Sequence, residues 1–236
     1  MVPLSEVAGR VRNPVWSSDG SWLVFESDRH SFRDLYRVSR FGQGLVRLTE
    51  ASGGAFEPDV SAQGEVVYGT SRDGNAEVYR MDPDSGKARR LTAYLGDDVR
   101  PRWSPDGQQI AWLSSRRGAP EVHLMAEDGS AVHPLRTSGQ GHVDRDVRWS
   151  PDGQRLAVVT QVGADRVDLT VVSVRGQVLW TAEAAPVQEH LEWSPDGQWL
   201  AWTATTDGRS EVWVADRDGQ SAARIAEAAW LPRWGA

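Results

Sequence analysis

The sequence predicts an all-β fold made of one four-stranded unit that is repeated along the chain. A five-residue motif recurs in it, as WSSDG at 16–20 and as WSPDG at 103–107, 149–153 and 193–197, with a degenerate copy, VSAQG, at 60–64. Successive motifs begin 44, 43, 46 and 44 residues apart. A nearly constant period of this length indicates one supersecondary unit copied in series, so the repeat decides the fold.

Each copy carries four short apolar runs that we expect to be β-strands. In the third copy they read RPRW, QIAWLS, EVHLMA and VHPLRT. Runs rich in Val, Leu, Trp and Tyr that are bounded by turn residues are typical of strands. The Ser-Pro-Asp-Gly segment supplies proline and glycine where a tight turn requires them. Each copy is therefore an antiparallel meander, and such a unit of about 40–50 residues is typical of a β-propeller blade.

The repeats predict a single β-propeller domain over residues 1–236 with five complete repeats. We expect these repeats near 13–55, 56–99, 100–144, 145–189 and 190–233. Strand remnants of a sixth repeat are expected at the termini, because residues 4–6 align with 48–50 and residues 231–234 resemble a first strand. Five blades with frayed ends, six blades with a minimal sixth, and a fragment of a longer chain all stay open.

Composition narrows the class of protein. The net charge is −7 and the chain has no basic block, which argues against a nucleic-acid partner and against a polybasic membrane anchor. No apolar stretch approaches the roughly 20 residues of a membrane span, and the start, MVPLSEVAGRVR, does not have the apolar core of a signal peptide. Cysteine is absent, so disulfides and thiolate metal sites are excluded.

The order of the motifs resembles a known repeat family. Pro-x-Trp-Ser-Pro-Asp-Gly is followed by an apolar strand, then Ser-x-Arg-x-Gly-x-x-Glu, then Val-Tyr and Arg-Leu-Thr; residues 100–124 are the cleanest copy. This pattern resembles the TolB-type (PD40, WD40-like) β-propeller repeat over residues 4–234. The second repeat lacks the Trp and the Pro-Asp pair, and the fourth lacks the Arg and Gly. The resemblance implies a bacterial scaffold that binds a protein in the cell envelope or periplasm.

One polar position recurs three residues before each motif tryptophan or its equivalent. First strands line the axis of a propeller, so we expect this position near one mouth of the channel. The mouth would receive a peptide end or a small ligand, or hold only water. The five residues at this position are Asn13, Glu57, Arg100, Asp146 and His190.

Charged loop residues form a second candidate site, a rim for a partner protein. They lie between second and third strands or between repeats: Arg29, Arg33, Arg72, Asp73, Arg116, Arg117, Asp98 and Arg145. The alternative is structural. Three repeats place an Arg five residues before an acid, which predicts clamps across each hairpin, in the pairs Arg29/Asp34, Arg72/Glu77 and Arg116/Glu121.

The motif residues themselves are expected to be structural. A tryptophan that recurs once per repeat suits packing between sheets better than a single ligand site. The motif aspartate is expected to bond nearby backbone amides in the turn. We expect no metal or cofactor, because Arg100 adds positive charge beside Glu57, Asp146 and His190, the residues of metal-ligating type.

The sequence favours a non-catalytic scaffold for a protein or peptide partner. It contains no G-x-S-x-G, H-E-x-x-H or G-x-x-x-x-G-K motif. One alternative is the substrate-gating propeller of a prolyl-oligopeptidase-like serine peptidase whose catalytic domain is absent from these residues. A second is a lectin-like binder of small ligands. The chain would act as a monomer or assemble through open sheet edges.

Overall fold

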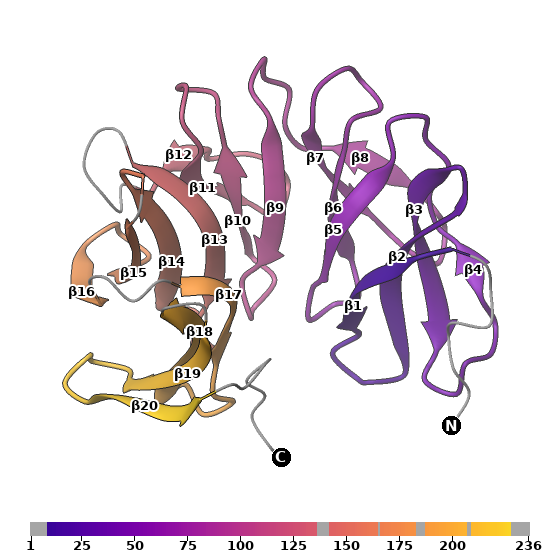
Figure 1. Cartoon of the computed structure of the whole chain (residues 1–236). Coiled ribbons are helices and arrows are strands. Elements are labelled where there is room, and N and C mark those ends of the chain that lie inside the picture. The colour runs from indigo at the N-terminus through magenta and orange to yellow at the C-terminus, as the bar shows by residue number, and fades with distance from the viewer. Residues whose placement is uncertain (1–8, 136–141, 165, 183–186, 207–208, 228–236) are drawn as a thin grey trace. The chain divides into compact units, whose positions relative to one another are not determined.

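The fold is all-β throughout the part of the chain that the structure describes. The structure is a computed structural model that describes residues 9–135, 142–164, 166–182, 187–206 and 209–227, without the side chains of 187–190, 205–206 and 227. These residues form 20 strands and no helix (Figure 1). The described residues accordingly contain no helix suited to crossing a bilayer. The termini expected to carry remnants of a sixth repeat, 1–8 and 228–236, lie outside the described residues.

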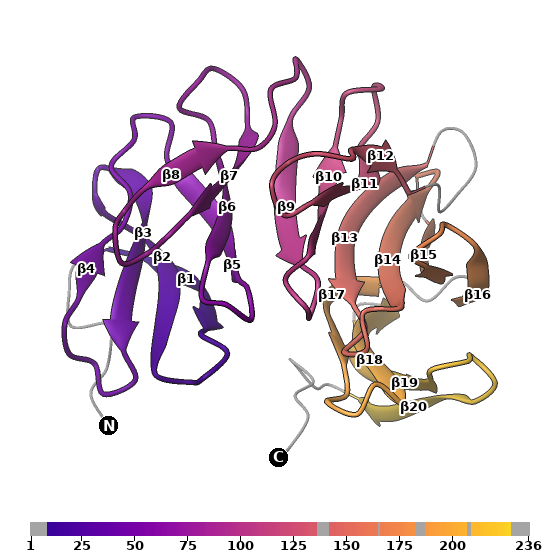
Figure 2. The same cartoon turned by 180° about the vertical axis from the view of Figure 1, so that it is seen from behind.

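The strands pair in sequence order into five four-stranded sheets, as predicted, and Figure 2 shows them from behind. The first three sheets comprise β1 (Val11–Trp16), β2 (Trp22–His30), β3 (Phe32–Ser39) and β4 (Val46–Arg47); β5 (Ala55–Val60), β6 (Val66–Thr70), β7 (Glu77–Met81) and β8 (Ala88–Arg90); and β9 (Asp98–Trp103), β10 (Gln109–Ser114), β11 (Glu121–Ala126) and β12 (His133–Pro134). The last two comprise β13 (Val143–Trp149), β14 (Arg155–Val162), β15 (Arg166–Ser173) and β16 (Val178–Ala182); and β17 (Val187–Trp193), β18 (Trp199–Thr206), β19 (Arg209–Asp216) and β20 (Ala222–Glu227).

The chain divides into two compact units. The N-terminal unit comprises residues 1–118 and 123–133, and the C-terminal unit comprises 119–122 and 134–236. Strands β11 and β12 of the third sheet contribute residues to both. The first two sheets lie in the N-terminal unit and the last two in the C-terminal unit.

The motif turns form as expected. In the first repeat, Asp19 Oδ1 accepts hydrogen bonds from Ser17 Oγ at 2.6 Å and from the Ser21 amide at 3.0 Å. The same two bonds recur at Asp106, Asp152 and Asp196. These bonds stabilise the ionised carboxylate and lower the pKa of Asp19 to about 2. The motif aspartate is therefore a turn former.

The core of the N-terminal unit lies between successive sheets. Val24, Leu35, Tyr68 and Met81 are all at most 2% exposed and join the first sheet to the second. Trp103, which ends β9, packs with residues of the second sheet and is 6% exposed. The core therefore follows the repeat, with β5 and β9 each packed against the sheet before it.

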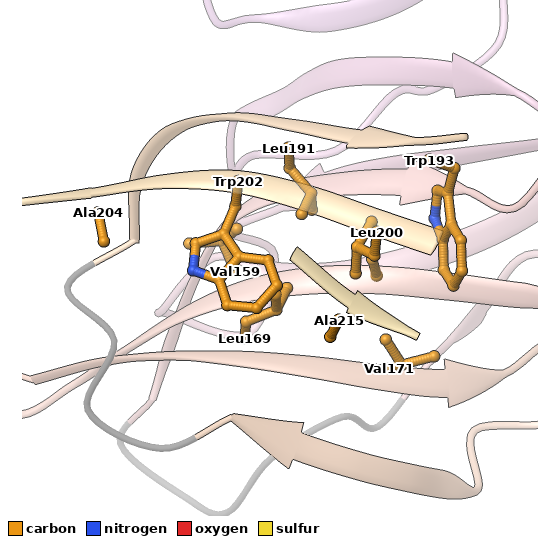
Figure 3. Close-up of a cluster of buried hydrophobic side chains, with 10 residues drawn as sticks. Val159, Leu169, Val171, Leu191, Trp193, Leu200, Trp202, Ala204 and Ala215 are labelled. Atoms are coloured by element: carbon orange, nitrogen blue, oxygen red, sulfur yellow. The ribbon is translucent and has the colours of Figure 1, made fainter. Parts of the chain in front are cut away.

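The core of the C-terminal unit has the same design (Figure 3). Leu169 and Val171 of β15 pack with Leu200 and Trp202 of β18. Trp193, which ends β17, joins the same cluster and is 7% exposed. The packing role predicted for the motif tryptophan is confirmed here and at Trp103.

Trp16 is the exception among the motif tryptophans. It is 52% exposed at the end of β1. No sheet precedes β1 among the described residues, so nothing described there covers the indole. Trp103 and Trp193 are buried because a preceding sheet supplies apolar partners.

Candidate functional site

The recurrent polar position lies at a β-bulge. Asn13, Glu57 and Arg100 have φ angles of 47°, 54° and 53°, in the left-handed region. The pairing of their strands with the next strand shifts register at the same place. Non-glycine residues persist in this region when surrounding contacts hold them there, and such residues cluster at functional sites. The bulge directs a polar residue and its backbone amide to the same end of the strand in all three repeats.

Two carboxylates join the three bulges of the N-terminal unit. Glu26, on β2, has no exposed surface, and its Oε1 accepts hydrogen bonds from Asn13 Nδ2 and from the Glu57 amide, both at 2.6 Å. Glu57 Oε2 in turn accepts a bond from the Arg100 amide at 3.0 Å, and its Oε1 lies 3.3 Å from Arg100 Nε. Arg33 Nη1 lies 3.4 Å from Glu26 Oε2. We call this connected set, Asn13, Glu26, Arg33, Glu57 and Arg100, the bulge network.

The structure thus brings three of the five predicted mouth residues together. Asp146 lies in the C-terminal unit, where its Oδ1 is 2.8 Å from Arg148 Nη1. His190 is on β17, and its side chain lies outside the described residues. Among the described residues, no group of three or more His, Asp or Glu side chains is placed to hold a metal ion.

Three of the predicted rim arginines stack on aromatic rings, although Arg29 lies within β2, and Arg33 within β3, rather than in the loop expected from the sequence. Arg29 lies 4.5 Å from the centroid of the Tyr36 ring, and Arg72 lies 3.9 Å from that of Tyr79. Arg116 lies 4.7 Å from the Tyr94 ring. A guanidinium within about 6 Å of a ring centroid is attracted by the ring quadrupole. Arg29 and Arg72 therefore cap aromatic side chains of their own repeats, and Arg116 caps Tyr94 of the preceding repeat.

The hairpin clamps predicted at Arg29 and Arg72 are wrong. Asp34 pairs with Arg47 of β4, at 2.6 Å, and Glu77 pairs with Arg90 of β8, at 2.7 Å. Both carboxylates have no exposed surface, and the hydrogen bond to Asp34 raises the pKa of Arg47. The fourth strand, rather than the preceding loop, supplies the cation because antiparallel pairing brings it alongside the third.

The other predicted rim residues are two acids that form contacts within the N-terminal unit and two arginines. Asp98 is fully buried, and it accepts from Trp112 Nε1 at 3.0 Å and pairs with Arg116 at 3.0 Å. Asp73 accepts from the Tyr79 hydroxyl and lies 3.4 Å from Arg90. Two further rim residues are Arg117, in the β10–β11 loop of the N-terminal unit, and Arg145, exposed on β13 of the C-terminal unit.

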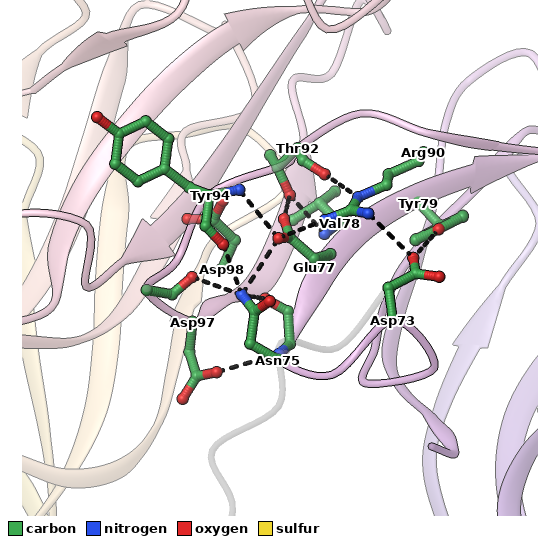
Figure 4. Close-up of polar contacts among 12 residues, drawn as sticks. Asp73, Asn75, Glu77, Val78, Tyr79, Arg90, Thr92, Tyr94, Asp97 and Asp98 are labelled. Carbon is green, nitrogen blue, oxygen red and sulfur yellow. Dashed lines mark hydrogen bonds and ion pairs between the residues drawn. The ribbon is translucent and has the colours of Figure 1, made fainter. Parts of the chain in front are cut away.

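The β8–β9 loop presents an apolar side chain that sequence reasoning missed. Leu95 is 99% exposed, and its neighbour Tyr94 is 53% exposed. The Asn75 side-chain amide donates to the carbonyls of Tyr94 at 2.8 Å and of Gly96 at 2.9 Å, on either side of Leu95. The Tyr94 amide donates to buried Glu77 Oε1 at 3.0 Å (Figure 4). The loop is therefore held rigidly while its leucine faces solvent.

Further contacts fix both ends of this loop. Thr92 Oγ1 donates to Glu77 Oε2 at 2.5 Å and accepts from the Val78 amide at 2.8 Å. At the other end, the Ala76 amide donates to Asp97 Oδ1 at 3.0 Å. One signal in the sequence could have found the loop: the corresponding connector of the first repeat reads TEASGGAF, and it has Ser52 where the second repeat has Leu95.

Consecutive four-stranded antiparallel sheets, each with a bulged first strand, define a β-propeller repeat protein. The sequence profile of the TolB beta propeller domain family matches residues 50–235. This match covers more than half of the chain, and the chain therefore belongs to that family.

Individual relatives agree. A TolB homolog from Chlorobium luteolum is 31% identical over 112 residues, which are 48% of this chain and 26% of that protein. The crystal structure of TolB from Acinetobacter baumannii covers 91% of this chain and 53% of its own, with a TM-score of 0.76 at 21% identity. A prolyl endopeptidase structure shares the fold at 14% identity, with a TM-score of 0.70 over 94% of this chain and 36% of its own. The chain thus matches about a quarter of the Chlorobium protein and half of the Acinetobacter one.

Proposed function

We propose that this chain is a non-catalytic scaffold that binds a protein partner through the loops around Leu95. These are the β6–β7 loop (71–76), the β8–β9 loop (91–97) and the part of the β10–β11 loop that belongs to the N-terminal unit (115–118). The observation that carries the proposal is Leu95 itself, a fully exposed leucine on a loop held by buried polar groups.

A rigid exposed leucine suits binding because the loop that carries it has already lost its conformational entropy in the free protein. Isolated exposed leucines are common and need no explanation. Here, however, Asn75 and Glu77 hold the backbone on both sides of Leu95, so binding would not have to order the loop. Preorganisation of this kind raises affinity by reducing the entropy lost on association. The expected partner surface is an apolar pocket.

Polar and charged groups complete the proposed surface. Arg116 stacks on Tyr94 beside Leu95, so a cation adjoins the apolar contact. Arg100, on the strand β9 that follows the Leu95 loop, has a side chain that is 43% exposed and adds a second guanidinium. A polar rim around an apolar centre is the usual anatomy of a protein interface. The relatives named TolB support placing the partner in a cell-envelope complex.

The acidic residues of the region support binding rather than acid–base catalysis. Glu26, Glu77 and Asp98 are buried, and each accepts hydrogen bonds from backbone or side-chain donors. A second candidate, the substrate-gating propeller of a prolyl-oligopeptidase-like enzyme, is supported by the fold shared with a prolyl endopeptidase. A catalytic domain encoded in the same reading frame would favour this second candidate.

Site-specific photo-crosslinking tests the binding surface. A photoreactive amino acid replaces Leu95 in one variant and Val132 in another; Val132 is 41% exposed on the β11–β12 connection. Both are expressed in the source bacterium, and adducts are identified by mass spectrometry. We expect one protein to be crosslinked at position 95 and not at position 132. No adduct at 95, or the same adduct at both positions, would contradict the proposal.

A further inference from the structure

The N-terminal unit contains a cavity that is lined by residues of its first two repeats. Its volume is about 110 Å³. That is several times the share of one water, about 30 Å³, and less than the roughly 300 Å³ at which drug-sized pockets begin. Its floor is buried and its rim is exposed or half-buried. The lining residues are Ala55, Tyr68, Thr70 and Met81 on the floor, and Leu48, Thr49, Glu50, Ala51, Arg72, Gly86 and Ala88 on the rim.

The Tyr68 hydroxyl has no hydrogen-bond partner among the described residues. Tyr68 is 2% exposed, lines the cavity and forms no hydrogen bond with any described residue. Burial raises its pKa to about 12, so the hydroxyl stays protonated and can donate. The hydroxyl oxygen is not fully enclosed by protein, so it is open to a molecule in the cavity.

Packing does not require this hydroxyl. Tyr68 pairs with Tyr79 across β6 and β7, and Phe25 pairs with Tyr36 at the same place in the first sheet. The side chains of Tyr68 and Phe25 are both buried, and Phe25 is buried without a hydroxyl group. The hydroxyl of Tyr68 is therefore not needed for packing, and it faces a cavity.

The cavity lining also carries a guanidinium, that of Arg72. Arg72 lines the rim and forms no ion pair with any carboxylate in the described ranges. The positive charge of Arg72 lowers the pKa of the Tyr68 hydroxyl, against the larger effect of burial, so the two groups interact. The one acid of the lining, Glu50, lies 3.1 Å from Arg47, which also pairs with Asp34. A hydrogen-bond donor and a guanidinium without an ion pair of its own thus line the same small cavity.

We propose that this cavity binds a carboxylate group carried on a short aliphatic stem. The Tyr68 hydroxyl would donate to one carboxylate oxygen and Arg72 would pair with the carboxylate charge. Ala55, Met81 and Leu48 would surround the stem. The group comes from a free small carboxylate or from an acidic side chain of another protein. Arg72 belongs to the β6–β7 loop of the proposed binding surface, but the proposal does not rest on the protein-binding function, because it requires neither Leu95 nor a partner at that loop.

Titration with propionate tests the proposal directly. The full chain, labelled with carbon-13 at the tyrosine Cζ and nitrogen-15 at the amides, is followed by NMR. We expect saturable shifts at the Tyr68 Cζ and the Thr70 amide with a Kd of the order of 1 mM. The isosteres 1-propanol and propylammonium should bind at least about tenfold more weakly, because neither carries the negative charge. No saturable shift at these two sites, or equal binding of 1-propanol, would overturn the proposal.

Three variants assign the interaction to its residues. Tyr68→Phe keeps the ring, as Phe25 shows, and should raise the Kd for propionate about fivefold or more. Arg72→Gln should raise it about tenfold or more. Arg29→Gln removes the equivalent stacked arginine of the first repeat, which does not line the cavity, and should leave the Kd unchanged. Unchanged binding in Tyr68→Phe and Arg72→Gln would overturn the proposal.

Capped tripeptides distinguish the two sources of the carboxylate. Acetyl-Gly-Glu-Gly-amide and acetyl-Gly-Gln-Gly-amide are titrated under the same conditions as propionate. Tighter binding of the Glu peptide than of propionate identifies an acidic side chain, and binding of propionate alone identifies a free small carboxylate. If the Gln peptide binds as tightly as the Glu peptide, the site does not recognise a carboxylate and the proposal is wrong.

Discussion

The backbone amide of Glu57 donates a 2.6 Å hydrogen bond to Oε1 of Glu26, a carboxylate with no exposed surface. This bond joins the first sheet to the second at a residue whose φ is +54°. The left-handed backbone at Glu57 directs the amide at Glu26, and the bond in turn holds the backbone there. The carboxylate therefore fixes the geometry of the bulge network.

Removing this carboxylate should destabilise the fold. Glu26→Ala leaves the Glu57 amide and the Asn13 side chain without their acceptor, and we expect the free energy of unfolding to fall by about 2–4 kcal/mol. Glu26→Gln keeps an acceptor oxygen and should cost less than half as much. Urea denaturation of the two variants measures the difference. Equal losses in both would show that the hydrogen bonds do not hold the bulges.

Asn75 should control the rigidity of the Leu95 loop. Asn75→Ala removes the bonds to the Tyr94 and Gly96 carbonyls, so the amides of 94–96 should exchange with solvent about 5–30 times faster. Global stability should fall by only about 1 kcal/mol. Gln63→Ala, which removes an exposed bond to Asp106, is the control. Exchange at 94–96 that matches the control would mean that Asn75 does not fix the loop.

Gly96 should tolerate no side chain. A Cβ at this position would lie 2.6 Å from the backbone carbon of Ser115 and 2.7 Å from the Arg116 nitrogen, so backbone would have to move. We expect Gly96→Ala to cost about 1–3 kcal/mol and to shift the amide resonances of residues 115–116. Ala93→Ser, at an exposed position of the same loop, should change neither the stability nor these resonances.

The motif turns should contribute to acid sensitivity. The folded pKa of Asp19 is about 2, below the roughly 3.9 of an unfolded aspartate. A depressed folded pKa gives stability that is complete above pH ~4 and is lost as the pH falls through about 2. In Ser17→Ala the strongest of the depressing hydrogen bonds is absent, so the pKa of Asp19 should rise, as measured by carbon-13 carboxyl NMR. An unchanged midpoint would contradict the assignment of the shift to Ser17.

Local chemistry made much of the fold predictable. The Pro-Asp-Gly turns and the apolar runs correctly predicted five repeats of four strands. The packing of Trp103 and Trp193 also followed, because a residue that recurs once per sheet meets the same neighbour each time. Trp16 differs because its surroundings, not its motif, differ.

The sequence did not predict which residues distant along the chain would pair with one another. Asp34 pairs with Arg47, thirteen residues later, because the β3–β4 register places Tyr36 opposite Arg47 and Asp34 shares the face of Tyr36. Arg29, the nearer arginine in sequence, stacks on the Tyr36 ring instead. Likewise, the sequence marked Asn13, Glu57 and Arg100 as polar, but not their left-handed backbone, which depends on acceptors from other strands.

The affinity of the partner for two leucine-loop variants tests the proposed binding function most directly. The partner crosslinked at position 95 is purified, and its Kd is measured by calorimetry for the wild type, Leu95→Ser and Val132→Ser. Leu95→Ser introduces the residue that the first repeat has at this place, Ser52. We predict that it raises the Kd about 30-fold, as truncation of a hot spot worth about 2 kcal/mol does, while Val132→Ser changes the Kd less than about twofold. Equal Kd values for Leu95→Ser and the wild type would contradict the account.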